Sequence, residues 1–275
     1  MGKRRVKKVL FQIIMILLSI PMIFPLLWMI RSSFMTDRQI LSVPIQWLPT
    51  AFSLSSFESI FRRFEFGRYF FNTFMIVALN VIGAVLSASF CAFGFARLRF
   101  RGRSVWFALL LSTIMIPSAV LMIPQFIGWS AINAYDTYWP LILPAFFGNA
   151  MNIFLVRQFY MGIPKAYDEA ALVDGAGYFQ IYLRVIMPMS VPALCTVGVL
   201  TFVYHWNDFI GPLIYISSGQ KRTLSLGLQM FIGEHTSQWN QMMAAAAVIT
   251  LPMIILYAFA QKYFIEGITL TGVKG

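Results

Sequence analysis

Charged residues are scarce in this sequence of 275 residues. Asp, Glu, Lys and Arg together make up 11% of the chain, whereas about a quarter is usual in a soluble domain. Hydrophobic residues reach 59%. This composition excludes an ordinary soluble globular chain and predicts an all-α, polytopic membrane protein whose core is buried against lipid and neighbouring helices.

Cysteines and catalytic motifs are also few. Cys91 and Cys195 stand in apolar runs, which excludes a disulfide framework and a metal-ligand spacing. No GxxxxGK[ST] phosphate loop occurs, so we expect the chain to bind no ATP and to hold no cofactor or metal of its own. The absence of HExxH, of a plausible pair of buried carboxylates and of a Ser-His constellation argues against an intramembrane enzyme. A secondary transporter would usually show internal repeats and intramembrane charge pairs, and neither is found.

Long apolar runs are abundant. Six of them reach the roughly 20 residues that a helix needs to cross a bilayer. They lie near residues 9–30, 70–96, 104–127, 138–157, 190–216 and 243–264. The first run follows a basic cluster, as in a signal peptide, but it is too long and lacks a small-x-small cleavage site, so we expect an uncleaved span. Residues 1–275 are then a single transmembrane domain.

Basic residues set the orientation, because cytoplasmic loops carry an excess of Lys and Arg. With the N-terminus inside, fourteen of the 21 basic residues fall on the inner side: Lys3, Arg4, Arg5, Lys7, Lys8, Arg97, Arg99, Arg101, Arg103, Arg157, Lys165, Arg184, Lys262 and Lys274. The other seven fall outside: Arg31, Arg38, Arg62, Arg63, Arg68, Lys221 and Arg222. Both termini are therefore expected in the cytoplasm, and the net charge of +11 reflects topology and not nucleic-acid binding.

Small residues line one face of the second span at helical spacing. They are Gly83, Ser87 and Cys91, beside Ala84, Ala88 and Ala92. Small residues four apart let helices approach closely in lipid, so this face is expected to pack within the chain or against a partner. Prolines in the third and fourth spans predict kinked helices: Pro117, Pro124, Pro140 and Pro144.

A long polar interval, from Pro164 to Pro188, separates the fourth and fifth spans. Its first part, Lys165 to Val173, has good helix formers and an acidic first turn, which predicts a helix. Asp174-Gly175 is expected to end that helix, because glycine adopts the left-handed conformation. A second helix, from about Tyr178 to Val185, is expected to stop at Pro188. The interval is thus predicted to be a short helix-turn-helix.

This interval resembles a known family. The residues that carry the resemblance are Glu169-Ala170-Ala171, Gly175 and Val185-x-Met187-Pro188, with Val185 and Met187 in place of the usual Ile and Leu. They are similar to the EAA loop of the permease subunits of binding-protein-dependent ABC importers. The stretch FPLLWMIRSSF and the closing TGVKG also resemble the MalG-like permeases of carbohydrate importers, so the resemblance covers nearly the whole chain from Pro25 to Gly275.

The resemblance implies a place in a bacterial plasma-membrane importer. The loop would be a coupling helix docked on a cytoplasmic ATPase, and the C-terminal tail would reach the ATPase dimer. The residues implied in this coupling are Glu169, Ala170, Ala171, Asp174, Gly175, Pro188, Val273 and Lys274. The implied partners are a second homologous permease, two ATPase subunits that bind ATP and Mg²⁺, and an extracellular or periplasmic solute-binding protein. The alternative is an amphipathic loop helix with no partner.

The fifth span is the most polar and carries Trp206, Asn207 and Asp208. An intramembrane carboxylate usually faces a cavity or a partner, and the tetrad that these residues form with Phe209 resembles a feature of carbohydrate importers. Amide and carboxylate groups suit sugar hydroxyls, and an indole suits the apolar face of a sugar ring. Alternatively, Asn207 and Asp208 cap the end of a kinked helix. In the fourth span, Asn149 and Asn152 are expected to bind neighbouring helices or a polar ligand.

Together these features predict a permease subunit, not an enzyme, of an ABC importer for a di- or oligosaccharide. The alternative substrate is glycerol 3-phosphate or another polyol. Outside this family, the alternatives are a secondary transporter and an intramembrane enzyme.

Overall fold

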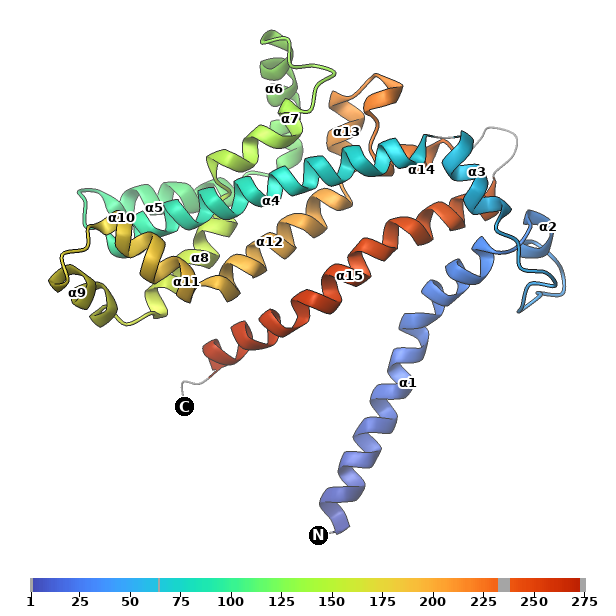
Figure 1. The fold of residues 1–275 in the computed structure, drawn as a ribbon, viewed down its shortest axis with the longest axis horizontal. Helices are drawn as coiled ribbons and strands as arrows, with labels where there is room; N and C mark the ends of the chain where they lie inside the picture. Colours follow the sequence, from blue (N-terminus) through green and yellow to red (C-terminus); the bar gives the residue numbers. More distant parts are fainter. Residues whose placement is uncertain (1, 64, 232–237, 273–275) are drawn as a thin grey trace. The chain divides into compact units, whose positions relative to one another are not determined.

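The computed structural model describes residues 2–63, 65–231 and 238–272, and every regular element in these ranges is helical (Figure 1). The predicted all-α fold is thereby confirmed. The chain divides into two compact units, the first formed by Met1–Gly67 with Gly227–Pro252 and the second by Arg68–Leu226 with Met253–Gly275. That residues 1–275 form one functional domain stays a prediction.

The first unit contains α1 (Gly2–Ser33), α2 (Asp37–Ile40), α3 (Ser55–Arg63) and the first part of α15 (Trp239–Gly272). Asp37 Oδ1 accepts a hydrogen bond of 2.9 Å from the backbone N–H of Asn240 in the first turn of α15. This carboxylate satisfies one of the donors that a helix N-terminus leaves unpaired. The apolar side chains of α1 are largely exposed, as expected of a helix that faces lipid or another subunit.

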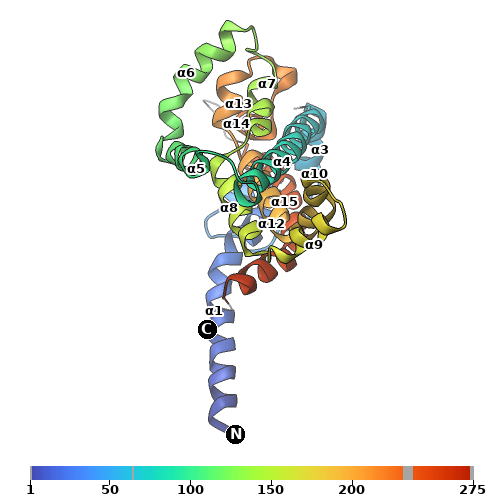
Figure 2. The same cartoon turned by 90° about the vertical axis from the view of Figure 1, so that its left-hand side faces the viewer.

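The second unit is arranged around α4 (Phe66–Arg97). The helices that follow are α5 (Arg103–Ser112), η1 (Thr113–Met115), α6 (Ser118–Ala131), α7 (Trp139–Ile142), η2 (Leu143–Phe147), α8 (Ala150–Gly162), α9 (Ala166–Val173), α10 (Tyr178–Ile181), the π-helical turn η3 (Tyr182–Ile186), α11 (Met187–Met189), α12 (Val191–Trp206), α13 (Ile210–Tyr215), η4 (Gly219–Lys221) and α14 (Leu224–Gln229). Within this unit, α9 and α10 lie at one end, away from α13 (Figures 1 and 2).

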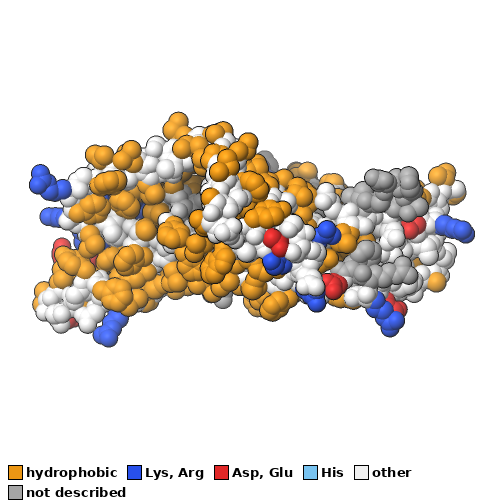
Figure 3. Space-filling model, turned by 90° about the horizontal axis from the view of Figure 1, so that it is seen from above, with side chains coloured by type: hydrophobic (Ala, Val, Ile, Leu, Met, Phe, Trp, Pro, Cys, Tyr) orange, Lys and Arg blue, Asp and Glu red, His pale blue; other side chains and the backbone are white. Residues whose placement is uncertain are grey.

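Among the described residues, four helices are long and apolar enough to cross a membrane: Lys7–Ser33, Phe66–Arg97, Trp139–Gly162 and Trp239–Gln261. Two bent helix pairs, Arg103–Met115 with Ser118–Ala131 and Tyr178–Met189 with Val191–Trp206, raise the number to six if each is one span. Their bends are 98° and 76°. Hydrophobic side chains also cover much of the face seen in Figure 3, where charged side chains are few and scattered. A multi-pass membrane protein is therefore supported, and the predicted six spans are the upper count.

Pro117 causes the first of these bends. Ile116, which precedes it, has the extended backbone (φ −81°, ψ 116°) that a following proline favours. The backbone N–H of Ile116 ends η1 by donating to the carbonyl of Thr113, and α6 begins at the next residue after the proline. The predicted kink in the third span is a complete break.

The small-residue face of α4 packs within the chain. Ala84, Ala88 and Ala92 are buried in one hydrophobic cluster with side chains of α8, η3 and α12. At Gly83 an added Cβ would lie 2.7 Å from the ring of Phe146, so a larger residue there would force this ring of η2 to shift. The prediction of a packing face is confirmed, and its partner is this chain.

Polar side chains of α4 bind backbone groups of the broken fourth span. Asn80 Nδ2 donates to the carbonyl of Leu141 at 2.9 Å, and Ser87 Oγ donates to the carbonyl of Ala145 at 2.8 Å. These carbonyls lie where α7 gives way to the η2 turn at Pro144, so the regular helical acceptor pattern is interrupted. Side chains of α4 thus supply donors that make a broken helix tolerable at membrane depth.

Side chains in the N-terminal part of α4 also bind backbone groups, here in the segment that leads into α14. Asn72 Nδ2 donates to the carbonyls of Gln220 at 3.0 Å and Arg222 at 2.9 Å. Thr73 Oγ1 accepts from the backbone N–H of Leu224 at 2.9 Å. All of these backbone groups are thereby held against one helix.

Two predicted features of the second half are wrong. The second helix does not end near Val185, because α10 continues through the wider π turn η3 into α11, which includes Pro188 and ends at Met189, one residue beyond it, where the chain bends by 76° into α12. The fifth span is not continuous over 190–216, because α12 ends at Trp206 and α13 begins at Ile210. The groups that cause this second break belong to the candidate site.

Candidate functional site

The turn after α9 is a Schellman motif. The N–H of Gly175 donates to the carbonyl of Leu172 at 3.0 Å, and the N–H of Ala176 donates to the carbonyl of Ala171 at 2.9 Å. Gly175 has φ +81°, the left-handed conformation that glycine adopts without strain. An added Cβ would meet no atom there, so the backbone angle alone requires glycine. The predicted helix, its end and the role of Gly175 in the turn are confirmed.

The exposed face of α9 combines one acid with apolar side chains. Tyr167, Glu169, Leu172 and Val173 are exposed, and Val173 has 88% of its surface free. Ala170 is exposed and Ala171 is half-buried against the cluster that includes α4. Beyond the turn, Tyr178 and Phe179 on α10 are exposed as well. A short helix at one end of the unit (Figure 1) therefore has an exposed face that carries both an acid and apolar side chains.

Asp168, next to Glu169, points inward. Its Oδ2 lies 3.3 Å from Nε of Arg97, the last residue of α4, and the two side chains are 17% and 4% exposed. Arg97 Nη2 also donates to the carbonyl of Ile163 at 2.9 Å, just beyond α8. Burial raises the pKa of Asp168, while the charge of Arg97 acts in the opposite direction. Arg97, interpreted from the sequence as a topology signal only, thus joins three elements.

Asn207 and Asp208 occupy the break between α12 and α13. Asn207 Nδ2 donates back to the carbonyl of Val203 at 2.8 Å. Asp208 Oδ1 accepts from the N–H of Gly211 at 3.0 Å, at the start of α13. Pro212 has no N–H for the carbonyl of Asp208, and the hydroxyl of Ser225 donates to that carbonyl at 2.6 Å. Both predicted residues therefore serve as caps here, which was the alternative interpretation.

The surroundings of Asp208 are tight. An added Cβ at Gly211 would overlap the Asp208 carboxylate and come within 3.1 Å of the side chain of Leu141. Trp206 is 2% exposed, stacked on Phe202 with ring centroids 5.2 Å apart. Its ring is enclosed by protein, which favours a packing role over stacking on a ligand.

The two asparagines of the fourth span do not act as a pair. Asn149 is the N-cap of α8, where its side chain accepts from the N–H groups of Met151 at 3.0 Å and Asn152 at 3.2 Å. The side chain of Asn152 is half-buried and has no hydrogen-bond partner in the part of the chain that the structure describes. Val273 and Lys274, the other predicted coupling residues, lie outside the described residues.

Asp136 binds the segment that follows α13, and the sequence alone did not predict this contact. Its Oδ1 accepts from the N–H groups of Ser217 at 3.0 Å and Ser218 at 2.9 Å, and its Oδ2 lies 3.0 Å from Nζ of Lys221. The hydroxyl of Ser218 binds the same carboxylate, and these hydrogen bonds hold the pKa of Asp136 well below its usual range. The available signal was that Asp136 is the lone carboxylate between Glu65 and Asp168.

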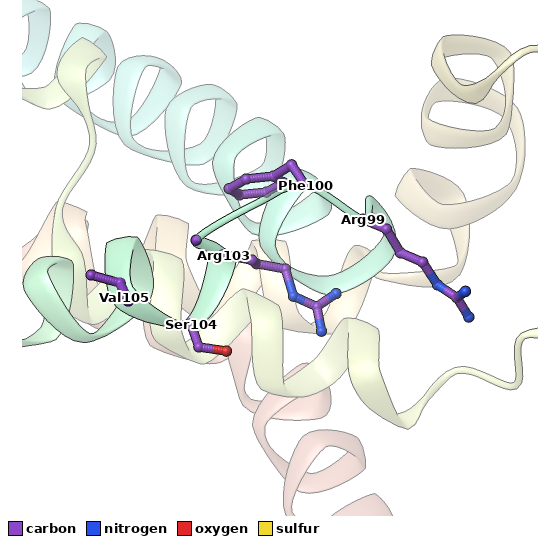
Figure 4. Close-up of a pocket in the computed structure, with 6 residues that line it drawn as sticks. Arg99, Phe100, Arg103, Ser104 and Val105 are labelled. Carbon is purple, nitrogen blue, oxygen red and sulfur yellow. The ribbon is translucent and has the colours of Figure 1, made fainter.

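A hollow of about 380 Å³ lies at the turn from α4 to α5 (Figure 4). It is lined by Arg99, Phe100, Gly102, Arg103, Ser104 and Val105. Figure 4 shows the side chains of Arg99 and Arg103 extending to the same side, away from the ring of Phe100, with their guanidinium groups apart from each other. In the described ranges no group of three or more His, Cys, Asp and Glu side chains is placed to hold a metal ion.

Comparison with known proteins finds a family and relatives that agree with one another. The family model described as "Binding-protein-dependent transport system inner membrane component" matches residues 80–269. The probable ABC transporter permease protein YurM of Bacillus subtilis is 33% identical over 268 residues, which cover 96% of this chain and 87% of that protein. The arabinooligosaccharides transport system permease protein AraQ of Halalkalibacterium halodurans is 31% identical over 258 residues, covering 92% and 91%.

A solved structure shares the fold. It is the crystal structure of a bacterial ABC transporter involved in the import of the acidic polysaccharide alginate. One of its chains superposes with a TM-score of 0.82 at 22% sequence identity, over 96% of this chain and 98% of that one. The overall fold is therefore shared with a chain of a known transporter.

Proposed function

Because this chain belongs to the family of binding-protein-dependent transport system inner membrane components, we propose that it is the permease subunit of an ATP-driven importer for a carbohydrate, a di- or oligosaccharide. It forms half of the translocation pathway. It is a transport subunit and not an enzyme, and ATP and Mg²⁺ bind to a partner ATPase.

The exposed face of α9 is the observation that carries the coupling part of this proposal. A helix that ends in a Schellman turn is rigidly presented, and Glu169 and Val173 stand free on its surface. An acid flanked by apolar side chains suits a cleft with a basic or backbone donor in its apolar wall. Ala170 allows close approach of the partner, and Asp174 and Gly175 shape the turn that follows.

The substrate class rests on the relatives. AraQ is named for arabinooligosaccharides, and the structural relative is named for alginate. Both are carbohydrates, which supports a sugar oligomer for this chain and does not favour glycerol 3-phosphate. Asn207 and Asp208 are the residues proposed to line the pathway or its outer gate, and Asn152, half-buried on α8, is a further candidate. Trp206 and Asn149 contribute by holding the local fold.

The excess of basic residues supports a cytoplasmic position for α9 and both termini in a bacterial cell. The opposite end of the second unit, at Asp136 and α13, then faces the solute-binding protein. The second homologous permease and lipid cover the exposed apolar helices, and two ATPase subunits take up the coupling helices. The tail with Val273 and Lys274 is proposed to reach the ATPase dimer.

Substitution of Glu169 tests the proposal. The permease is reconstituted in vesicles with its partner permease, ATPase and binding protein, and ATP hydrolysed per sugar imported is measured. Glu169→Ala should weaken ATPase copurification or raise that ratio, because a charge-assisted hydrogen bond contributes about 1.5–3 kcal/mol when partly buried. Membrane insertion should be unchanged, since Glu169 is exposed on α9.

Glu58→Ala is the matched control, because Glu58 is an exposed acid on another short helix, α3, and forms a surface ion pair with Arg62 four residues on. It should behave as wild type. If Glu169→Ala also keeps wild-type ATPase retention and ratio, α9 is not the coupling helix and the proposal is wrong.

A further inference from the structure

Arg97 and Asp168 form an ion pair away from the exposed face of α9. Arg97 comes from the last turn of α4, Asp168 from the first turn of α9, and both side chains are largely buried. The second contact of Arg97, to the carbonyl of Ile163, ties the same guanidinium to the end of α8. One side chain therefore spans the junction of three helices.

A contribution to folding stability does not by itself explain why an ion pair occurs at this junction. Taking two charges out of water costs free energy that their attraction offsets only when the remaining polar atoms are satisfied. Here Asp168 Oδ1 and Arg97 Nε are both buried without a hydrogen-bond partner among the described residues, so the two side chains interact through their charges. An apolar contact at this junction would cost less, so the charges point to a role in linking α9 to α4.

We propose that Arg97 is a positioning residue that fixes α9 to α4, so that displacement of α9 by the ATPase moves α4. This inference rests on the proposed function, because it requires α9 to be the coupling helix. It adds the residue through which the motion enters the membrane-spanning helices.

Continuous contacts lead from Arg97 to the candidate pathway. α4 holds the carbonyl of Leu141 through Asn80 at 2.9 Å, and the side chain of Leu141 lies against Gly211 beside Asp208. Movement of α4 therefore acts on the break between α12 and α13 by way of the fourth span. Such a chain of contacts shows a route, and coupling along it requires a functional measurement.

A double-mutant cycle provides that measurement. Arg97→Gln, Asp168→Asn and the double variant are reconstituted as above, with ATP per sugar and ATPase copurification as readouts. Each single variant should retain the ATPase, because the exposed face of α9 is untouched, and should raise the ratio several-fold. The double variant should raise it no further than the worse single variant, since both changes break one link. Arg99→Gln, at an exposed arginine two residues on, should keep the wild-type ratio.

The double variant also serves as a control for misfolding of the single variants. Removing one partner leaves a buried charge unpaired, whereas removing both does not, so the double variant should accumulate in the membrane at least as well as either single variant. If a single variant fails to accumulate, the double variant decides: a wild-type ratio overturns the inference, and a raised ratio supports it.

The other outcomes separate the two claims. If Glu169→Ala uncouples transport while Arg97→Gln and Asp168→Asn keep the wild-type ratio, the inference is wrong and the proposed function stands. If Arg97→Gln loses the ATPase as Glu169→Ala does, the residue shapes the docking surface and the inference is also wrong. If none of the variants, Glu169→Ala included, changes the ratio or the ATPase retention, the coupling part of the proposed function fails.

Discussion

Asp208 shows how one carboxylate serves two neighbouring backbone segments. It caps α13 by accepting from Gly211, while its own carbonyl accepts from Ser225 because Pro212 cannot donate. The capping role accounts for its position beside Asn207 without a ligand. A role in the pathway requires the charge in addition to the cap, so a substitution that separates charge from capping is informative.

Asp208→Asn makes this separation, because an amide oxygen can accept from Gly211 while the charge is lost. If the carboxylate serves the pathway, Asp208→Asn should reduce sugar uptake several-fold with little change in thermal stability. Asp208→Ala should lose uptake and, in addition, about 0.5–2 kcal/mol of stability with the cap. Uptake and stability are measured in the reconstituted complex; normal uptake by Asp208→Asn would leave the residue as a cap only.

Residues such as Arg97 and Asp136 set the limit of what the sequence predicts. Both were visible as charges, one in a basic run and one alone in a long uncharged stretch. Asp168 lies 71 residues after Arg97 in the chain, and the partners of Asp136 lie 81 to 85 residues after it. Periodicity and spacing are local properties, so they identify α9 and Gly175 but not contacts of this kind.

Elements with local signals were predicted well and elements broken by distant contacts were not. The helix at Lys165–Val173 and its glycine end follow from adjacent residues, and the structure has them as α9 and its Schellman turn. The break at residues 207–209 depends on Ser225, and the π turn that carries the chain past Pro188 depends on packing against α4. Prolines indicate where a helix can break, but contacts with residues distant in the sequence determine whether the helix ends, bends or continues.

Gly175 allows the turn after α9 to be tested as an element. Gly175→Ala places a side chain at φ +81°, which costs about 1–2 kcal/mol and should displace α9. We expect weaker ATPase retention or a higher ratio of ATP to sugar, with normal membrane insertion. Gly177→Ala is the control, because Gly177 has φ −75° and open space for a Cβ. If Gly175→Ala and Gly177→Ala behave alike, the turn after α9 has no role in coupling to the ATPase.

For the whole molecule, the positive-inside count predicts that α9 and the loop after α13 lie on opposite sides of the membrane. Cysteines are introduced singly at Val173 and Gln220, both exposed, in a background with Cys91 and Cys195 replaced by serine. A membrane-impermeant maleimide should label Gln220→Cys in intact cells and Val173→Cys only in inverted vesicles. Labelling of both from one side, or the reverse pattern, would contradict the orientation.

The polar face of α4 has a consequence for how the protein is made. Translation completes α4 long before the groups it will bind, because the acceptors of Ser87, Asn80 and Asn72 follow 58 to 150 residues later. A nascent chain that has reached only α4 can offer Asn80 a single acceptor, the carbonyl of Ile76 one turn back in the same helix. The polar side chains of α4 must therefore be kept away from lipid at the translocon, or pair transiently with other polar groups, until the fourth span has been synthesised.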